Sequence, residues 1–438
     1  MAESEKMKQS SGTLLLRGGR VIDPANKIDA MMDLLVDGGR IKTIDLPGKI
    51  PAGGSAVVEL AGKIVTPGLI DIHVHLREPG QEWKETIATG AEAAVAGGFT
   101  TICCMPNTVP PIDNAQVAKY VLEKAAAAGL ARVLPIGTIT KGREGKGLSP
   151  MVELKEAGCV AFSDDGFPVS HAGLMRRALE YGLMLGAVMT VHEEELQLSE
   201  EFSMNESAVS LKLGLKGMPG AAEDVMISRD IELARMTGGR IHFCHVSTAR
   251  AVTLIRRAKE DGIPVTAEVT PHHLTLDDSC LESYDTNYKM SMPLRSRADI
   301  DGLLAGLADG TIDCIASDHA PHEADSKNRE FDRASFGILG LQTTVPLILG
   351  LVRSGKLTLP RAIAALTTDP ARCFNLKAPS LSPGSVADIT VIDPDRTVVH
   401  SAEMIRSKSK NTPFIGQSLQ GAAAQTYIAG NKVYDIDG

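Results

Sequence analysis

The strongest constraint on the fold is a regular alternation of apolar and helical segments, which runs from Gly68 to about residue 340. Alanine-rich helical stretches, such as 86–96 and 115–128, lie between apolar runs that have the length of buried strands. Repeated strand–helix units give parallel strands with right-handed crossovers. We count eight strand candidates, which predict an α/β fold closed into a (β/α)8 barrel of the TIM type: Leu69–His75, Thr100–Cys104, Val133–Thr138, Cys159–Ser163, Val188–His192, His242–Val246, Pro264–Val269 and Asp313–Ser317.

Short β segments lie on both sides of this region. Residues 13–66 contain four apolar runs separated by glycine pairs such as Gly18-Gly19, and residues 387–393 and 427–434 have the same texture. We expect the two ends to pack together as one small β-sandwich domain that the barrel interrupts. The predicted boundaries are 1–66 and 380–438 for the two parts of the β-sandwich and 67–379 for the barrel.

Composition excludes several classes of partner. The chain has 438 residues, a net charge of −9 and only 4% aromatic residues, which argues against binding nucleic acid. The apolar run 345–352 is too short to span a bilayer, and residues 1–11 are too polar for a signal peptide. The seven cysteines show no Cys-x-x-Cys spacing and read as reduced. We therefore expect a cytoplasmic protein with no membrane partner.

The first strand candidate carries two histidines with the spacing of metal ligands. Side chains on a strand repeat every two residues, so Asp71, His73 and His75 share one face. Two imidazoles at the end of a strand can hold one metal ion and leave other coordination positions open. A half-buried strand that happens to carry two histidines is the alternative.

Polar residues at the ends of the other strands favour the metal site. In a barrel of this kind, catalytic residues lie at the carboxyl ends of the strands. Each residue alone has an ordinary structural explanation, but together four histidines and two carboxylates suit one or two zinc ions. The residues that end the strands on this rim are His73, His75, Asn107, Asp164, Asp165, His192, His245 and Asp318.

Longer strings around these residues resemble a known family. They are Asp71–Gly80 (DIHVHLREPG), Met105–Thr108 (MPNT), Phe162–Gly166 (FSDDG) and Ser317–His322 (SDHAPH). The first pattern, with the histidines of strands five and six and the aspartate of strand eight, resembles the amidohydrolase superfamily. The full strings resemble the dihydroorotases of the bacterial type I class, and the resemblance runs from about Gly18 to the C-terminal hairpin.

The resemblance implies a role for each site residue. His73, His75 and Asp318 would hold the first zinc ion, His192 and His245 the second, and Asp165 would bridge them. A hydroxide between the metals would attack the substrate, with Asp318 as proton shuttle. The reaction would reversibly interconvert N-carbamoyl-L-aspartate and (S)-dihydroorotate in de novo pyrimidine (UMP) biosynthesis. The residues expected to bind this small molecule are Arg77, Asn107, Ser291, His322, Phe336 and Gly337.

The chemistry of ring opening agrees with these residue types. Opening a cyclic amide needs a hydroxide, a polarised carbonyl and a proton for the leaving nitrogen. Arg77, two residues beyond His75, is placed for a bidentate grip on the substrate carboxylate. The alternative is an ordinary arginine on a surface loop.

Other functions remain open at this point. Dihydropyrimidinases, hydantoinases and allantoinases resemble the chain but carry a lysine for carboxylation on strand four, where this chain has none; Lys155 precedes Gly158, on the preceding helix. A non-catalytic, dihydroorotase-like scaffold for aspartate transcarbamoylase would lack the metal ligands, which are present here. An active enzyme could also bind aspartate transcarbamoylase, or form a homodimer.

Two positions depart from the family pattern. The loop after strand seven usually reads Asn-Pro-Pro-Leu-Arg, whereas this chain has Ser291-Met292-Pro293-Leu294-Arg295. A serine can still donate and accept a hydrogen bond, but it reaches less far than asparagine. Gln342 stands where glutamate is common. These departures bear on the substrate and the catalytic rate, not on the metal site.

Overall fold

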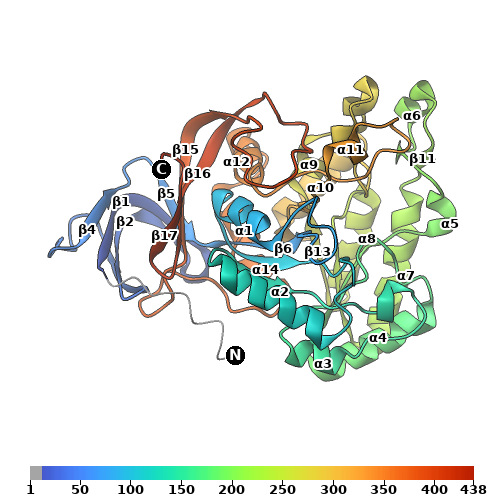
Figure 1. Ribbon diagram of the computed structural model, residues 1–438, viewed down its shortest axis with the longest axis horizontal. Helices are drawn as coiled ribbons and strands as arrows, with labels where there is room; N and C mark the ends of the chain where they lie inside the picture. Colours follow the sequence, from blue (N-terminus) through green and yellow to red (C-terminus); the bar gives the residue numbers. More distant parts are fainter. Residues whose placement is uncertain (1–11) are drawn as a thin grey trace.

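The computed structural model describes residues 12–438 (Figure 1). The expectation for residues 1–11 lies outside this range. In residues 12–438, no helix combines the length and the apolar character that a membrane crossing requires. All seven cysteines, which fall within the described range, are free thiols, and six of them are buried.

The central part of the chain is α/β, as the alternation predicts. Two sheets consist only of parallel strand pairs. The first sheet contains β6 (Leu69–Val74), β7 (Phe99–Cys104) and β8 (Arg132–Pro135). The second has the order β14-β13-β12-β9, with β9 (Val188–Val191), β12 (Arg240–Phe243), β13 (Val265–Val269) and β14 (Cys314–Ile315).

The expected fourth strand is reduced to single bridges. Phe162 bridges Gly137 on one side and Met189 on the other, and Val74 bridges His319 at the opposite edges of the two sheets. The backbone of this segment still bonds to both neighbours, since the Val160 N–H donates to the Pro135 carbonyl and the Phe162 N–H to the Val188 carbonyl, each at 3.0 Å. The bridges thus lie at both gaps between the parallel sheets.

Helices connect the strands with the boundaries that their capping residues indicate. Thr86 forms a capping box with Thr89 at the start of α1 (Ile87–Ala96), and Asn114 caps α2 (Ala115–Ala128), which ends at Gly129. Both predicted helices are confirmed. The other long helices are α4 (Ala172–Leu185), α7 (Ala221–Thr237), α8 (Ala249–Glu260), α10 (Arg297–Asp309) and α12 (Thr344–Arg353).

Shorter elements fill the connections. The short helices are α3 (Met151–Glu156), α5 (Leu196–Ser199), α6 (Ala208–Leu213), α9 (Pro271–Thr275), α11 (Ala324–Lys327), α13 (Leu359–Ala365) and α14 (Thr368–Cys373). Single 3-10 turns cover Pro24–Asn26, Lys141–Arg143, Asp278–Ser283 and Thr286–Tyr288. A separate parallel pair joins β10 (Met204–Asn205) to β11 (Gly217–Met218).

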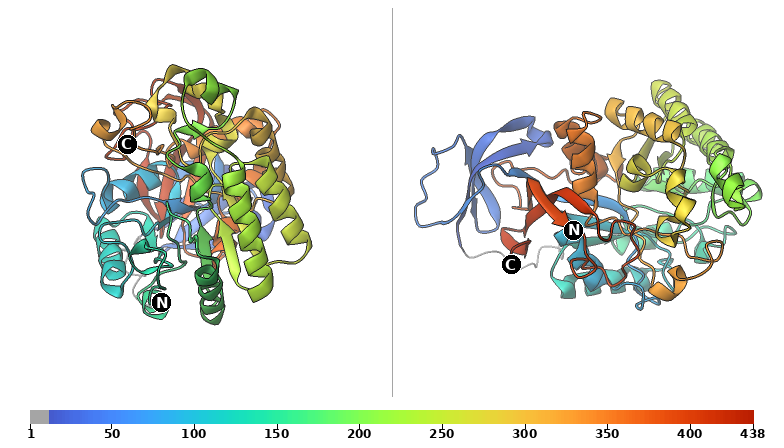
Figure 2. Two further views of the ribbon diagram at one scale, coloured as in Figure 1. Left: turned by 90° about the vertical axis from the view of Figure 1, so that its right-hand side faces the viewer. Right: turned by 90° about the horizontal axis from the view of Figure 1, so that it is seen from above.

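Both ends of the chain build one sheet, which occupies one end of the molecule (Figures 1 and 2). Its order is β17-β16-β15-β5-β1-β2-β3, with β4 paired to β1, and the antiparallel pair β5–β15 joins the two ends. The strands are β1 (Leu14–Asp23), β2 (Ile28–Asp37), β3 (Arg40–Asp45), β4 (Ala56–Glu59), β5 (Ile64–Pro67), β15 (Ile389–Val399), β16 (Ser418–Ile428) and β17 (Asn431–Asp435).

One glycine pair has a different role from the expected one. Gly18-Gly19 does not separate two strands but lies inside β1, where the register with β2 shifts between Leu16 and Gly19. Gly18 has a φ of 71°, and its N–H donates to Asp33 Oδ1 at 2.8 Å. The pair is therefore a β-bulge, the other common use of glycine within a strand.

The sheet of the chain ends packs directly on the α/β part. Helices α1 and α12 contact β16. The Thr390 hydroxyl donates to the Gly98 carbonyl at 2.6 Å, and the Thr426 hydroxyl donates to the Val95 carbonyl at 2.7 Å. The long connection between β15 and β16 leaves the sheet and reaches toward the α/β part (Figure 1).

Candidate metal centre

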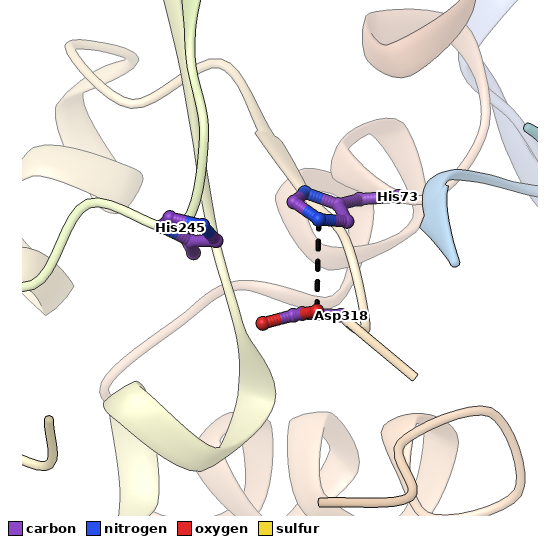
Figure 3. A group of neighbouring side chains, drawn as sticks. All are labelled: His73, His245 and Asp318. Carbon is purple, nitrogen blue, oxygen red and sulfur yellow. Dashed lines mark ion pairs between the residues drawn. The ribbon is translucent and has the colours of Figure 1, made fainter. Parts of the chain in front are cut away.

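Four histidines and two carboxylates meet in one buried cluster. His73 lies on β6, and His75, His192, His245 and Asp318 follow β6, β9, β12 and β14. Asp165 follows the bridge residue Phe162. All six side chains are at most 5% exposed. The structure thus brings together every residue that the sequence predicts as a metal ligand, and Figure 3 shows three of them, His73, His245 and Asp318, around a common space.

Donor atoms in the cluster are close enough to share metal ions. His75 Nε2 lies 3.1 Å and His73 Nε2 3.6 Å from Asp318 Oδ1. Asp165 lies between the two histidine pairs, with its carboxylate 3.5 Å from Nε2 of both His73 and His75 and 3.9 Å from His245 Nε2. His192 Nδ1 is 3.1 Å from His245 Nε2. Asp165 can therefore contribute to two adjacent ligand groups.

Local backbone structure aims these side chains. The Asp71 carboxylate, on the same strand as His73, accepts the backbone N–H of His73 at 3.1 Å and that of Ser317 at 3.1 and 3.2 Å. His245 and Asp318 have φ angles of 32° and 44°, in the left-handed region. Non-glycine residues adopt this conformation at a cost and are concentrated at functional sites, where surrounding contacts hold them.

Three histidines of the cluster each contact an outer side chain through one ring nitrogen, so that the other ring nitrogen faces the cluster. A carboxylate only accepts hydrogen bonds, so the Glu268 contact to His73 Nδ1 at 2.6 Å and the Glu194 contact to His192 Nε2 at 2.9 Å each place a proton there. When these rings are neutral, His73 Nε2 and His192 Nδ1 carry the lone pairs, and both nitrogens face the cluster, where His192 Nδ1 lies 3.1 Å from His245 Nε2. This orientation by an outer partner is usual for metal-binding histidines.

Asn107 orients a third histidine in the same way. Its Nδ2 donates to Asp165 Oδ2 at 3.1 Å, which fixes the amide and turns its Oδ1 toward His75 Nδ1 at 2.9 Å. His75 Nε2 is left with its lone pair directed at Asp165 and Asp318. Among residues 12–438, His73 Nε2 is a buried nitrogen without a hydrogen-bond partner. A cation would satisfy these nitrogens, so the donor set fits a metal ion.

The charge of the cluster also favours cations. Burial opposes ionisation of Asp318, but the neighbouring histidines outweigh it and lower the pKa of this carboxyl to about 2. Burial acts in the same direction on Asp165, and hydrogen bonds with His245 and His73 hold the pKa of Asp165 well below its usual range. Two ionised carboxylates in a buried pocket lined by imidazoles favour a divalent ion, whose binding would displace the protons that the imidazoles carry.

The residues predicted to bind substrate lie beside this cluster in part. Arg77, which has a φ of 60°, donates through Nε to the Pro321 carbonyl at 3.2 Å, and its Nη2 lies 3.3 Å from His322 Nε2. Gly337 packs so tightly that a Cβ there would lie 2.8 Å from His322 Cδ2. Phe336 stacks on Phe202 with ring centroids 4.9 Å apart. Asn107, which was expected to bind substrate, contacts the histidine–aspartate cluster through both its amide oxygen and its amide nitrogen.

The two departures from the family pattern have different surroundings. Ser291 is half-buried and precedes Met292, whose buried side chain packs with Met218 and whose carbonyl contacts His273 Nε2 at 2.9 Å. Gln342 instead holds a C-terminal loop, because its Nε2 donates to the Met404 carbonyl at 2.9 Å and its Oε1 accepts the Arg406 N–H at 2.7 Å.

Sequence reasoning missed two carboxylates of the site. Glu268 lies on β13, within the predicted strand Pro264–Val269, and Glu194 follows His192 by two residues. A fully buried charge is rare unless it is paired. A glutamate inside an otherwise apolar strand was therefore a usable signal for a partner such as His73.

Comparisons with known proteins agree with this geometry. A family model described as "Dihydro-orotase-like" matches residues 62–251. The chain is 50% identical to the dihydroorotase of Geobacter metallireducens over 421 residues, which cover 96% of this chain and 99% of that protein. It is 51% identical to the dihydroorotase of Anaeromyxobacter sp. strain K over 427 residues, covering 97% and 98% of the two chains.

Solved structures with the same fold include two hydantoinases. The L-hydantoinase (dihydropyrimidinase) from Arthrobacter aurescens superposes with a TM-score of 0.86 at 24% identity and covers 97% of this chain and 96% of its own. The D-hydantoinase (dihydropyrimidinase) from Thermus sp. gives 0.80 at 25% identity, with 96% and 95% covered. At this identity the similarity describes the fold alone.

Fold, site and relatives together define a hydrolase that acts on cyclic amides and whose buried histidine–aspartate groups could bind metal. More narrowly, the chain belongs to the dihydroorotase family.

Proposed function

We propose that the protein is a zinc-dependent dihydroorotase of the bacterial type I class, which interconverts N-carbamoyl-L-aspartate and (S)-dihydroorotate in pyrimidine biosynthesis. The single observation that carries this proposal is the set of buried histidine nitrogens that face Asp165 and Asp318 at 3.1 to 3.9 Å. Two dihydroorotases that are 50% and 51% identical to this chain over nearly its full length support the same activity.

The proposal includes a closed (β/α)8 barrel over residues 67–379. The bridges at Phe162 and between Val74 and His319 support closure, since they lie at the edges of the two parallel sheets. Residues 1–66 and 380–438 would form the small β-sandwich domain, and the pairing of β5 with β15 supports that division. The six cluster residues would lie at the carboxyl-end rim of the barrel.

The ligand assignment follows the geometry of the cluster. His73, His75 and Asp318 would hold one zinc ion and His192 and His245 a second, with Asp165 between them. Bound zinc lowers the pKa of water and polarises a carbonyl, which are two of the three requirements for opening the ring. The third, a proton for the leaving nitrogen, would pass through Asp318: its carboxylate, beside His73 and His75, would take a proton from the attacking water and give it to the nitrogen.

Substrate binding would use residues next to the metal ligands. A guanidinium can bind a carboxylate with two parallel hydrogen bonds, and Arg77 would hold the carboxylate of dihydroorotate in this way, with His322 at its side. The backbone at Phe336–Gly337 would border the ring, together with Ser291 and Asn107.

Hydantoinase chemistry is the less favoured assignment, although those enzymes share the fold. In hydantoinases a carboxylated lysine would bridge the two metal ions, and in this chain Asp165 would take that role. Lys155, the lysine that precedes this segment, lies on α3 and donates to the Leu185 carbonyl. It is therefore engaged away from the histidine cluster.

The test combines metal analysis with a substrate panel on the purified protein. We expect bound zinc and ring opening of dihydroorotate, with much slower turnover of hydantoin and allantoin. His73→Ala should lose activity and metal while keeping its melting transition. Turnover of hydantoin or allantoin without dihydroorotate would contradict the substrate, and a folded, inactive wild-type protein loaded with metal would favour a scaffold role.

A further inference from the structure

A segment from the C-terminal part of the chain lies against the loops of the site. Residues 404–412, in the connection between β15 and β16, are held by partners far away in sequence. The Lys408 N–H donates to Glu85 Oε1 at 3.0 Å, and the Ser409 hydroxyl donates to the Lys84 carbonyl at 2.6 Å. Glu85 is fully buried and also contacts the Ser407 hydroxyl. The 404–412 segment is therefore a fixed part of this rim.

Asn411 connects the 404–412 segment to two loops at once. Its Nδ2 donates to the carbonyls of Ala320 at 2.9 Å and Gly337 at 3.0 Å, and its Oδ1 accepts the N–H of His322 at 2.9 Å. The side chain is 4% exposed. The carbonyls of Ala320 and Gly337 need a donor and the N–H of His322 needs an acceptor, and a side-chain amide supplies both. No other uncharged side chain of this size supplies the same donors and acceptor.

The loops that Asn411 joins carry His322 and Gly337, which we assign to the substrate. Gly337 has a φ of 148°, and a Cβ at this position would lie 2.7 Å from the Ala320 carbonyl oxygen. The loop that contains Ala320 and His322 is therefore packed directly against the loop that contains Gly337. The Leu339 N–H also donates to the Asn411 carbonyl at 3.0 Å, so backbone and side chain of Asn411 hold the same loop.

We propose that Asn411 is a positioning residue that sets the spacing between His322 and Gly337 and thereby the substrate-binding side of the site. This inference rests on the proposed function, because both contacts matter only if a dihydroorotate-like molecule binds there. The metal side has separate supports in Glu268, Glu194 and Asn107. Loss of the Asn411 amide should consequently weaken substrate binding more than it changes metal content or turnover.

Asn411→Asp is the direct test. Aspartate keeps the shape and the acceptor for His322 but removes the donor to the Ala320 and Gly337 carbonyls. Two lost hydrogen bonds with buried acceptors predict a rise in KM for dihydroorotate of roughly tenfold or more, with kcat changed by less than about threefold. Zinc content should equal that of the wild-type enzyme. KM and kcat are measured on the metal-loaded full chain in both reaction directions.

Gln342→Glu is the matched control. Gln342 also holds the 404–412 segment through an amide, but its partners are Met404 and Arg406, and it contacts neither His322 nor Gly337. The same exchange of amide for carboxylate should leave KM within about twofold of wild type. If both variants raise KM equally, loosening of the whole segment explains the effect and the specific role of Asn411 is wrong.

The remaining outcomes separate the inference from the function on which it rests. An active wild-type enzyme with an unchanged KM in folded Asn411→Asp overturns the inference and leaves the proposed function intact. A wild-type protein without dihydroorotase activity overturns the proposed function itself. If Asn411→Asp fails to fold, Asn411→Ser, which keeps one donor and one acceptor, is judged by the same KM criterion.

Discussion

Replacing Glu268 with glutamine should weaken metal binding without disturbing the fold. The Glu268 carboxylate is fully buried on β13, with Oε1 2.6 Å from His73 Nδ1 and Oε2 3.1 Å from His242 Nε2. Burial opposes its ionisation, but the charge and hydrogen bonds of His73 and His242 keep the pKa of Glu268 far below its usual value. Glutamine has the same shape, yet it carries no charge and offers one acceptor oxygen instead of two.

The size of the effect follows from what the carboxylate does for His73. A charged acceptor makes a hydrogen bond roughly twice as strong as a neutral one and raises the basicity of the opposite ring nitrogen. Removing such an outer partner of a metal ligand typically lowers metal affinity by about 10- to 100-fold. This corresponds to about 1.4–2.8 kcal/mol of binding free energy.

Competition between the protein and a chelator of known affinity measures this change directly. The matched control is Asp313→Asn, because Asp313 is also a buried carboxylate. It lies just before β14, at the end of that strand away from Asp318, and it contacts Lys259 and Arg372 but no histidine of the cluster. Its metal affinity should stay at the wild-type value. A folded Glu268→Gln protein that binds zinc within about twofold of wild type would refute the argument that Glu268 orients His73.

Two further predictions concern the substrate side. Arg77→Lys keeps the charge but loses the planar fork, so KM for dihydroorotate should rise about tenfold while zinc content is unchanged; an unaltered KM would contradict the assigned carboxylate contact. Lys327 donates to the Gly337 carbonyl at 3.2 Å, and burial together with Lys289 lowers its pKa to about 7. A folded-state pKa below the unfolded value of about 10.5 means that the unfolded chain binds more protons between these pH values, so this residue favours folding more as pH rises from 7 to 10. The stability of wild type relative to Lys327→Met should therefore increase over that interval, by up to about 4 kcal/mol in denaturant unfolding, and a constant difference would contradict the shifted pKa.

Local sequence signals were sufficient wherever one segment determines its own structure. The helix at 115–128 was predicted from its alanine-rich sequence, and the structure shows the same bounds, with Asn114 and Gly129 as the caps. The histidine–aspartate cluster could be predicted because parallel strands bring their carboxyl ends together, so residues such as His192 and Asp318 could be placed before their contacts were known.

Contacts between distant segments were beyond the reach of the same reasoning. Glu268 is 195 residues from His73, and Asn411 is 74 residues from Gly337. Neither pairing leaves a periodic pattern in the sequence. The fourth strand lies where its apolar run predicts, between its two neighbours, but it is joined to them by single bridges and backbone hydrogen bonds rather than by a full ladder.

Glu268 and Asn411 would hold the site from opposite directions. Glu268 acts from inside the parallel strands and fixes the nitrogen that faces the metal, whereas Asn411 belongs to the connection between β15 and β16 and fixes the loops that face the substrate. Strand β15 pairs with β16 on one side and with β5, from the N-terminal part of the chain, on the other. Because the 404–412 segment connects two strands of that sheet, we expect the sheet built by both chain ends to support substrate binding through Asn411. A truncation that removes it would lose the Asn411 contacts even if the parallel strands remained folded.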